Sequence, residues 1–395
     1  MIRKMPTEPE YVLLSDLLGA EIASARIEAA LDADRTLAVL WRSEAAIVEA
    51  AASIGLEDVR ISERDLLLRV ASNGASGVEA RAVEDALDVL RFLRAPGNAL
   101  EDPLELCARV WRLSRRGDQG AVDAGEAMQL SENEAVEIFA QCRGRAPVLE
   151  AILAARRYAL LTERASPVGE RMIFSAAEQA SRARGGGMPR AGADEDILRG
   201  LGGRISARWV ALPATAMSSG RFHIWSPSGA QGVRNILSAL AGHQHRELGR
   251  LIPARAWIEK MRGVGQGRHG RSRLADAAGS FGLEPLQTSG RLADLLGITQ
   301  RGAINLLEAL MAEGLVCELT HRRAARIWAT PMLAARLGAM PVRRTHPAGR
   351  PGSPGPGKGR GPDEADAAAA MEDFDKIMGE ADALLARFAS RSSGF

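Results

Sequence analysis

Aromatic residues are scarce in this 395-residue chain, where Phe, Trp and Tyr together make up 4%. Hydrophobic residues nevertheless account for 46%, so the core must consist mainly of Ala, Leu, Ile and Val. A composition rich in Ala and Leu favours helices over sheets, because aromatic and β-branched residues are the usual strand formers. We therefore expect a mainly α-helical protein, long enough for about two or three domains.

Cysteine is scarce as well, and Cys107, Cys142 and Cys317 are far apart in the sequence. Their odd number and their spacing argue against a disulfide framework and against a metal-binding pair. The N-terminal residues lack a long apolar stretch, and no later stretch is long enough to cross a membrane. A cytoplasmic protein is therefore expected.

Lysine is nearly absent, so almost all of the 51 basic residues are Arg. Arg is the better ligand of phosphate and guanine, but a GC-rich coding sequence accounts for most of this bias. Because the formal net charge is only +2, composition alone does not indicate a nucleic-acid partner.

Helical periodicity dominates residues 1–184, which we expect to form one helical domain. Leu14, Leu18, Ile22 and Ala25 follow one stripe of the first helix. The expected helices cover 9–32, 35–54, 78–94, 103–116, 131–144, 147–164 and 168–184.

A second helical and irregular region, 195–262, is expected to pack on this domain. Two further helices are predicted at 232–250 and 253–262. Residues 205–232 have no clear period, and there Trp209 and Trp225 are expected to anchor the core, with a ligand pocket as the less favoured alternative.

Residues 263–340 contain the pattern of a winged helix-turn-helix, most clearly from 286 to 332. A first helix has an apolar face formed by Leu292, Leu295 and Leu296. Gly297 follows where the turn needs a positive φ angle, and Thr299 is a suitable N-cap for a second helix. The apolar side chains of that second helix are Ile304, Leu306, Leu307 and Leu310.

The outer face of the second helix carries polar residues near its start. The start of a recognition helix enters the major groove, where such residue types pair with adenine or guanine. We therefore expect base contacts from Thr299, Gln300, Arg301 and Asn305.

Two paired strands, 315–319 and 326–330, are expected to follow and to enclose a basic turn. Arg322, Arg323 and Arg326 are the predicted phosphate contacts of this wing. Further basic surface would come from Arg262, Arg268, Arg271, Arg273, Arg343 and Arg344 if they lie alongside. The block itself is close to charge balance, so a winged helix used only for protein contacts stays an alternative.

The C-terminal residues differ in character. Residues 341–362 are expected to be a disordered Pro/Gly-rich linker, and 363–395 an acidic amphipathic helix. Its apolar stripe, spaced as in a coiled coil, needs a partner. The sequence leaves open docking onto its own chain or a homodimer through Met371, Phe374, Met378, Leu385 and Phe388.

Two family resemblances accompany these patterns. The stretches LADLLGIT, LLEALMAEGLV and RIWAT resemble the C-terminal winged helix of many Fic-family proteins. The Fic motif HPFxxGNGR is absent, since GVGQGRHGR at 263–271 lacks the leading His-Pro-Phe, and nucleotidyl transfer is therefore not carried over.

The chain up to about residue 335 also resembles an uncharacterised family from plasmids of rhizobia and related bacteria. The matching stretches are SARIEAALDADR, EDVRISERDLLLRVA, PVLEAILAARRYALL and LIPARAWIEKM. This resemblance implies a helical domain of unknown function joined to a C-terminal helix-turn-helix, with a DNA-binding role, no known enzyme activity and no known ligand.

The predicted function is therefore a DNA-binding transcriptional regulator or plasmid-associated factor that binds double-stranded DNA. No catalytic residue, cofactor or metal is expected; His243 and His245 stand two apart on a helix and do not share a face. The alternative is a degenerate Fic-like enzyme or a partner-binding helical module, in which the winged helix only docks or regulates.

Overall fold

The computed structural model describes residues 8–57, 80–115, 128, 130–162, 166–185, 207–219, 224–264, 273–320 and 326–337. All of them belong to the first of two compact units, Met1–Val342 and Arg343–Phe395. The expected linker at 341–362 and the helix at 363–395 lie outside the described residues. The domain limits within the first unit stay a prediction.

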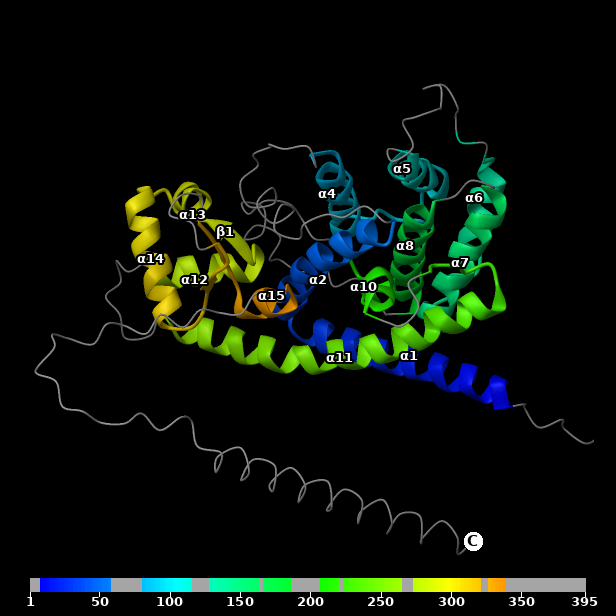
Figure 1. The fold of residues 1–395 in the computed structure, drawn as a ribbon, viewed down its shortest axis with the longest axis horizontal. Helices are drawn as coiled ribbons and strands as arrows, with labels where there is room; N and C mark the ends of the chain where they lie inside the picture. Colours follow the sequence, from blue (N-terminus) through cyan, green and yellow to red (C-terminus); the bar gives the residue numbers. More distant parts are fainter. Residues whose placement is uncertain are drawn as a thin grey trace, which may run out of the picture. The chain divides into compact units, whose positions relative to one another are not determined.

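The described residues form 13 α-helices and three short strands (Figure 1). The predicted fold class is confirmed at this level, since the chain is mainly helical and has a small antiparallel sheet near its C-terminal end. In chain order the elements are α1 (Glu8–Ala33), α2 (Arg35–Gly55), α4 (Ala80–Arg94), α5 (Pro103–Arg115), α6 (Glu132–Phe139), α7 (Pro147–Leu161), α8 (Pro167–Gly185), α10 (Pro213–Ser218), α11 (Ala230–Gly263), α12 (Leu274–Leu283), β1 (Leu286–Thr288), α13 (Ser289–Leu296), α14 (Gln300–Ala312), β2 (Cys317–Glu318), β3 (Ile327–Ala329) and α15 (Pro331–Arg336).

Helix α1 packs along α11, and the two run side by side in Figure 1. Its buried face consists of Ala20, Ala23, Ile27 and Leu31. The stripe that indicates the helix in the sequence points the other way, because Leu14, Leu18 and Ile22 are 48%, 49% and 51% exposed. The periodicity therefore identifies the helix but not its inner face, which combines small residues with Ile27 and Leu31.

Helix α11 is continuous over 34 residues, so the prediction of two separate helices at 232–250 and 253–262 is wrong. Pro253 lies inside it and removes one intrahelical N–H donor. Contacts with α1, α2, α10, α12 and α15 along its length hold the helix together across this position.

The start of α6 is fixed by a capping arrangement between two nearby side chains. The Ser131 hydroxyl accepts a hydrogen bond from Glu134 N at 3.4 Å, and the Glu134 carboxylate accepts one from Ser131 N at 2.9 Å. This reciprocal pair is a capping box, which satisfies two N–H groups that the first helical turn leaves open.

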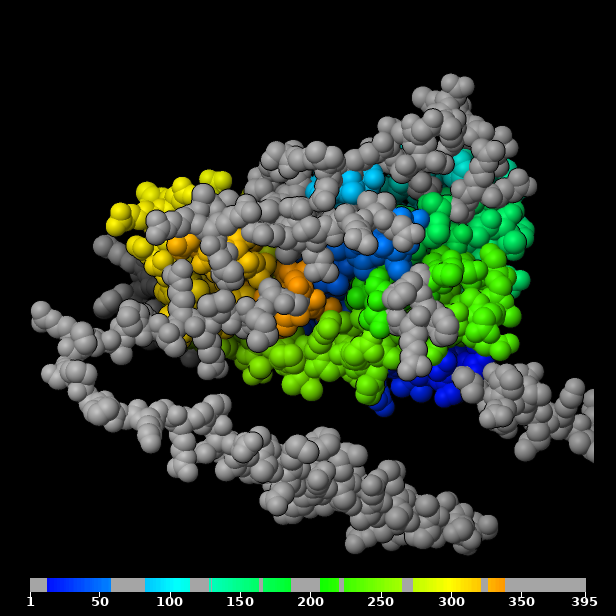
Figure 2. Space-filling model, in the orientation of Figure 1, coloured from blue at the N-terminus to red at the C-terminus, as the bar shows by residue number. Residues whose placement is uncertain are grey.

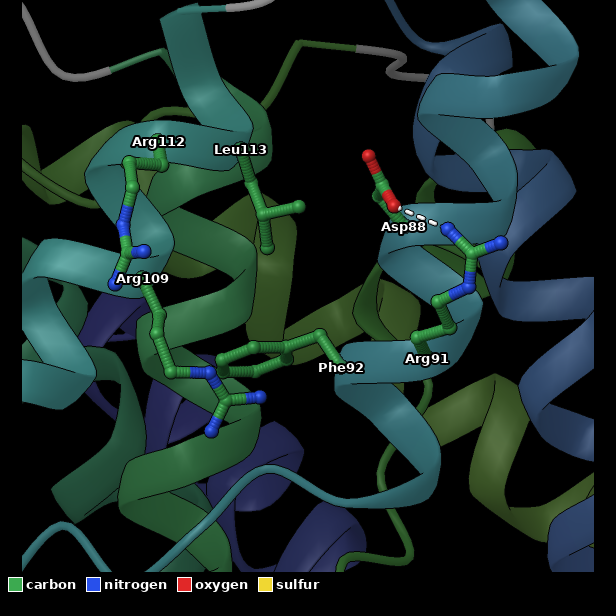
Figure 3. A pocket seen from close by; sticks show the side chains of 6 residues that line it. All are labelled: Asp88, Arg91, Phe92, Arg109, Arg112 and Leu113. Carbon is green, nitrogen blue, oxygen red and sulfur yellow. Dashed lines mark hydrogen bonds and ion pairs between the residues drawn. The ribbon is translucent and has the colours of Figure 1, made fainter. Parts of the chain in front are cut away.

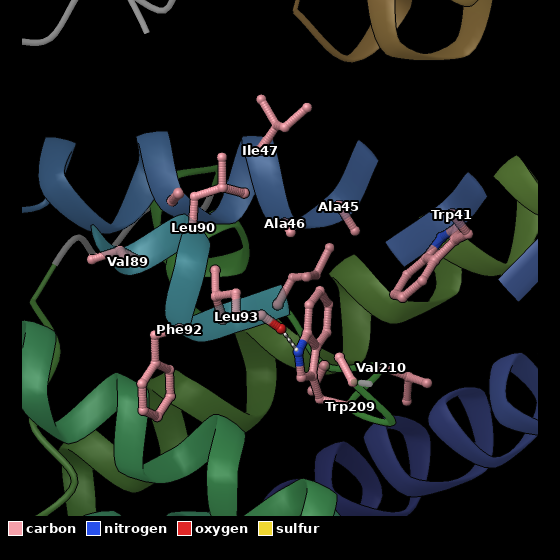
Figure 4. Close-up of a cluster of buried hydrophobic side chains, with 14 of the residues drawn as sticks. Trp41, Ala45, Ala46, Ile47, Val89, Leu90, Phe92, Leu93, Trp209 and Val210 are labelled. Carbon is pink, nitrogen blue, oxygen red and sulfur yellow. Dashed lines mark hydrogen bonds between the residues drawn. The ribbon is translucent and has the colours of Figure 1, made fainter. Parts of the chain in front are cut away.

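Trp209, which belongs to the segment 207–212, anchors the core against α2 and α4 (Figure 4). Its Nε1 donates to the Leu93 carbonyl at 2.7 Å, and its ring lies 6.0 Å from that of Trp41. Trp225 is also buried and meets Phe174 edge to face. The expectation that both tryptophans are core residues is confirmed.

The C-terminal part of the described chain has the strand order β1-β3-β2, with both pairings antiparallel. Cys317 of β2 and Leu286 of β1 both pair with Ala329 of β3. The predicted pairing of the last two strands is confirmed, while β1, α12 and α15 add to the expected pattern. Helix α12 packs against α2 and α11 and so joins this part to the helical body.

All three cysteines are buried and unpaired, and burial raises the pKa of Cys107 to about 12. Within the described ranges, no helix combines the length and the apolar character needed to span a membrane.

A buried carboxylate on α11, Glu247, connects three distant helices. Arg336 of α15 donates to it from two guanidinium nitrogens at 2.9 and 2.5 Å, and Trp41 Nε1 of α2 donates at 3.1 Å. Burial acts to raise the pKa of Glu247, but Arg336, together with His243 and Arg250, outweighs burial and holds the pKa below its ordinary value. Figure 2 shows the orange surface of α15 beside the blue α2 and above the green α11.

A second buried carboxylate, Glu44 of α2, extends this cluster. Arg336 Nε lies 3.6 Å from Glu44 Oε2, and the Thr330 hydroxyl donates to Glu44 Oε1. Thr330 is also the N-cap of α15. Burial raises the pKa of Glu44 to about 7, so in a fraction of the molecules the Glu44 carboxyl holds a proton near neutral pH.

Arg336→Ala should strongly destabilise the fold, because it leaves Glu247 and Glu44 buried without their main cation. Breaking a buried ion pair costs about 3–5 kcal/mol, and we expect that loss in the free energy of unfolding measured with urea. Arg112→Ala is the control: Arg112 and Glu105 form an ion pair with side chains 66% and 56% exposed, and such surface pairs contribute about 0–1 kcal/mol. Equal losses in the two variants would contradict the account.

Glu44→Gln tests the raised pKa of Glu44. The folded chain binds this proton more tightly than the unfolded chain, so stability falls as pH rises from 4.5 through about 7. Glutamine does not ionise. Between about pH 5 and pH 8, the free energy of unfolding of the variant should therefore fall by roughly 1–3 kcal/mol less than that of the parent chain. Urea unfolding at both pH values measures this, with the exposed Glu105→Gln as control. A fall as large as in the parent chain would count against the buried carboxyl.

Candidate functional site

The turn between α13 and α14 is shaped by one glycine and one threonine. Gly297 ends α13 with φ +61° and ψ +40°, a left-handed conformation that glycine adopts without strain. The Thr299 hydroxyl then accepts a hydrogen bond from Gly302 N at 3.1 Å and caps α14. Ala293 is buried in α13, which packs directly against α14. The turn predicted from the sequence is therefore present, with the expected residues in the expected roles.

Helix α14 has an inner face that packs on α12 and α13 (Figure 1). Ala303, Leu307 and Leu310 are fully buried. Ile304 and Leu306, expected to be inward, are half-buried at the edges of this face. The buried residues recur at helical spacing, so the opposite side of the helix is left to polar residues.

The four residues predicted to contact bases are all exposed and come together at the start of α14. Gln300 Nε2 donates to the Ser289 hydroxyl at 3.2 Å, while Thr299 serves as the N-cap. Arg301 forms no hydrogen bond or ion pair in the part of the chain that the structure describes. Asn305 lies one turn beyond Arg301, so the two side chains are neighbours on one face.

The predicted wing residues fall into two groups. Arg322 and Arg323 lie outside the described residues. Arg326 enters β3 and is partly buried; its Nε lies 3.6 Å from Glu318, and its NH1 lies 3.9 Å from Glu308. Two carboxylates therefore already face this guanidinium.

The flanking arginines that are described also have partners. Arg262 lies 3.6 Å from Asp34, and Arg273 pairs with Asp276 at 2.9 Å and donates to the Leu296 carbonyl at 2.9 Å. Arg268, Arg271, Arg343 and Arg344 lie outside the described residues. Among the described cations near the start of α14, Arg301 is thus the one most available to an anion.

A small hollow between α4 and α5 is a second place in the described part of the chain where arginines gather (Figure 3). The Arg109 guanidinium lies over the Phe92 ring, 5.2 Å from its centroid, and donates to two backbone carbonyls. Arg91 and Arg112 pair with carboxylates at 2.6 and 2.7 Å. The three guanidinium groups are engaged within the fold, so this hollow offers an anion little unpaired charge. The hollow has a volume of about 210 Å³. Its lining residues are Asp88, Arg91, Phe92, Arg109, Arg112 and Leu113.

The histidines at 243 and 245 are separated as expected for two positions on one helix. His243 is buried 3.5 Å from Glu247, and burial lowers its pKa to about 4. His245 is exposed. Among the residues that the structure describes, no group of three or more His, Cys, Asp or Glu could hold a metal ion.

Sequence reasoning missed α12, which packs against the inner face of α14. Its buried residues Leu274, Ala277, Ala278 and Phe281 stand at i, i+3, i+4 and i+7, a spacing that indicates a helix. Strand β1 has only three residues and carries no comparable signal. The carboxylates that face Arg326 could not be assigned from the sequence, because the hairpin geometry brings Glu318 beside it.

No protein-family model matches the chain, and no curated protein matches it. The geometry and chemistry of the described residues therefore carry the functional conclusion.

Thr299→Ala should weaken the start of α14, because Gly302 N loses its acceptor. Replacing a threonine N-cap by alanine costs about 1 kcal/mol, which urea unfolding can measure. Thr299→Ser keeps the hydroxyl and is the matched control, with most of the stability retained. If the serine variant loses as much as the alanine variant, the cap is not the reason.

Proposed function

We propose that α12 to β3 form a winged helix-turn-helix that binds double-stranded DNA. The order of elements supports this: a helix, a short strand, two helices joined by a glycine turn, and an antiparallel hairpin. The observation that carries the proposal is the exposed polar start of α14, held from behind by three fully buried side chains. A helix supported in this way can enter the major groove while its inner face stays in the core.

The chemistry of the exposed residues suits base recognition. Arg301 can bind guanine through two hydrogen bonds, and Gln300 and Asn305 are the types that pair with adenine. Thr299 uses its hydroxyl oxygen in the cap, and its O–H remains a donor. The unpaired N–H groups of the first turn of α14 add a local positive potential that favours a nearby phosphate.

For the phosphate contacts we assign Arg322 and Arg323 before Arg326. Glu308 and Glu318 already face Arg326, so a phosphate would have to compete with two carboxylates for its guanidinium. In this proposal Arg326 mainly positions the hairpin beside α14.

The wider role is that of a transcriptional regulator or plasmid-associated factor. Regulators of this type commonly bind paired half-sites as dimers, and the candidate dimer contacts Met371, Phe374, Met378, Leu385 and Phe388 stay a prediction. They lie outside the described residues.

A second candidate function, partner binding by the helical body, is favoured by one observation. Leu14, Leu18 and Ile22 leave an apolar stripe about half exposed on α1. Contiguous exposed apolar surface often marks a protein contact. In this case the elements from α12 to β3 would only dock or regulate, and α14 would not need to touch DNA.

Arg301→Ala should reduce DNA affinity without changing the fold. Duplexes enriched by the protein from a random library supply a target, and fluorescence anisotropy at about 100 mM salt measures its affinity. Losing a bidentate arginine costs about 1–3 kcal/mol, so we expect roughly a 5- to 150-fold weaker complex. The parent complex should also weaken steeply as salt increases.

The matched control is Arg255→Ala, an exposed arginine of α11 that does not belong to the exposed start of α14, which should change affinity less than about twofold. Equal losses from Arg255 and Arg301 would indicate non-specific charge. No enrichment of any duplex by a folded protein would reject DNA binding and leave partner binding as the leading function.

A further inference from the structure

A groove of about 410 Å³ lies where α11 passes α15 and the turn after α14. It is separate from the exposed start of α14 and uses other residues. Its volume falls within the range of about 300–1,000 Å³ that is usual for small-molecule sites. The lining residues are Arg250, Pro253, Ala256, Trp257, Lys260, Gly314, Pro331, Met332, Ala335 and Arg336.

The middle of the groove is apolar and firmly held. Trp257 is only 5% exposed, and its Nε1 donates to the Leu315 carbonyl at 2.8 Å, so the indole is fixed between α11 and the turn after α14. Pro253 and Met332 face the same space from the two sides. An apolar ligand body would gain roughly 25 cal/mol for each Å² that it removes from water here.

The charged lining is entirely cationic, but its members differ in availability. Arg336 and Arg250 both donate to Glu247, and Arg336 also approaches Glu44. Lys260, in contrast, makes no hydrogen bond or ion pair among the residues that the structure describes. A Cβ added at Gly314 would lie 3.6 Å from Lys260 Nζ, which places the free ammonium over the turn that follows α14.

The two α11 cations of the lining, Arg250 and Lys260, lie at opposite ends of the groove. Residues 250 and 260 stand ten positions apart, which is about 15 Å of helix, so one small head group cannot contact both. The Arg250 end is already neutralised by Glu247, whereas the Lys260 end is not. The groove therefore offers one free cation at one end and an apolar channel leading away from it.

We propose that this groove binds a small organic carboxylate with an apolar body. The carboxylate pairs with Lys260, and the body lies over Trp257 towards Pro253 and Met332. This ligand site goes beyond the proposed DNA binding and does not depend on it. A ligand there would contact both the helical body and the segment directly after α14.

Octanoate is the probe, and calorimetric titration of the full chain without DNA is the measurement. Octanoate should bind with saturation, while octylammonium, of equal chain length and opposite charge, should not. Lys260→Met should weaken octanoate binding about tenfold, the effect expected for one charge-assisted hydrogen bond. Ala256→Trp fills the groove from an exposed position and should abolish binding.

Arg255→Met is the matched control, since it removes a cation from the same helix outside the groove and should leave the affinity within about twofold. Unchanged urea midpoints show that the variants are folded. The proposal is overturned if octanoate does not saturate, if octylammonium binds equally well, or if Lys260→Met and Arg255→Met act alike. Because DNA is absent, a failure of DNA binding leaves this outcome unaffected.

Discussion

The bonding of Glu247 to Arg336 is the interaction on which the arrangement of this protein depends. A buried carboxylate or guanidinium alone would be strongly unfavourable, and each is tolerated because the other is present. Trp41 and Arg250 complete the donors around Glu247, and Thr330 and Arg336 bring Glu44 into the same cluster. Since these groups come from α2, α11 and the region of α15, they can be satisfied together only when the elements α12 to α15 lie against the helices that precede them. The position of α14 follows from that contact.

The same chemistry holds the loops of the helical body. Glu49 accepts hydrogen bonds from Ala214 N and Thr215 N and so caps α10, while Glu178 accepts from two backbone N–H groups at the end of the segment 207–212. Glu150 accepts from four successive backbone N–H groups of residues 143–146. These buried glutamates fix irregular backbone segments, because each carboxylate satisfies several N–H donors that would otherwise be buried unpaired.

The features that the sequence predicts well are those that depend on interactions within a few residues of the chain. The left-handed turn at Gly297 and the cap at Thr299 need only neighbours three or four positions away. The features it does not predict depend on distant contacts. The outward direction of Leu14, Leu18 and Ile22 depends on how α1 meets α11. The continuity of α11 through Pro253 depends on packing along its whole length, and Trp41 and Glu247 are bonded across 206 positions. For the candidate site, the exposed face of α14 was predictable, while the pairing of Arg326 was not.

These constraints lead to one functional arrangement: a rigid body that presents the start of α14 to solvent with Arg301 unpaired. The most direct test places a photoreactive benzoylphenylalanine at position 305 and, in a second sample, at the exposed position 255 of α11. Each protein is irradiated with its enriched duplex, and covalent adducts are counted. The account predicts adducts from position 305 and few from position 255. Equal yields from the two positions, or adducts from position 255 alone, would show that α14 is not the surface that meets DNA.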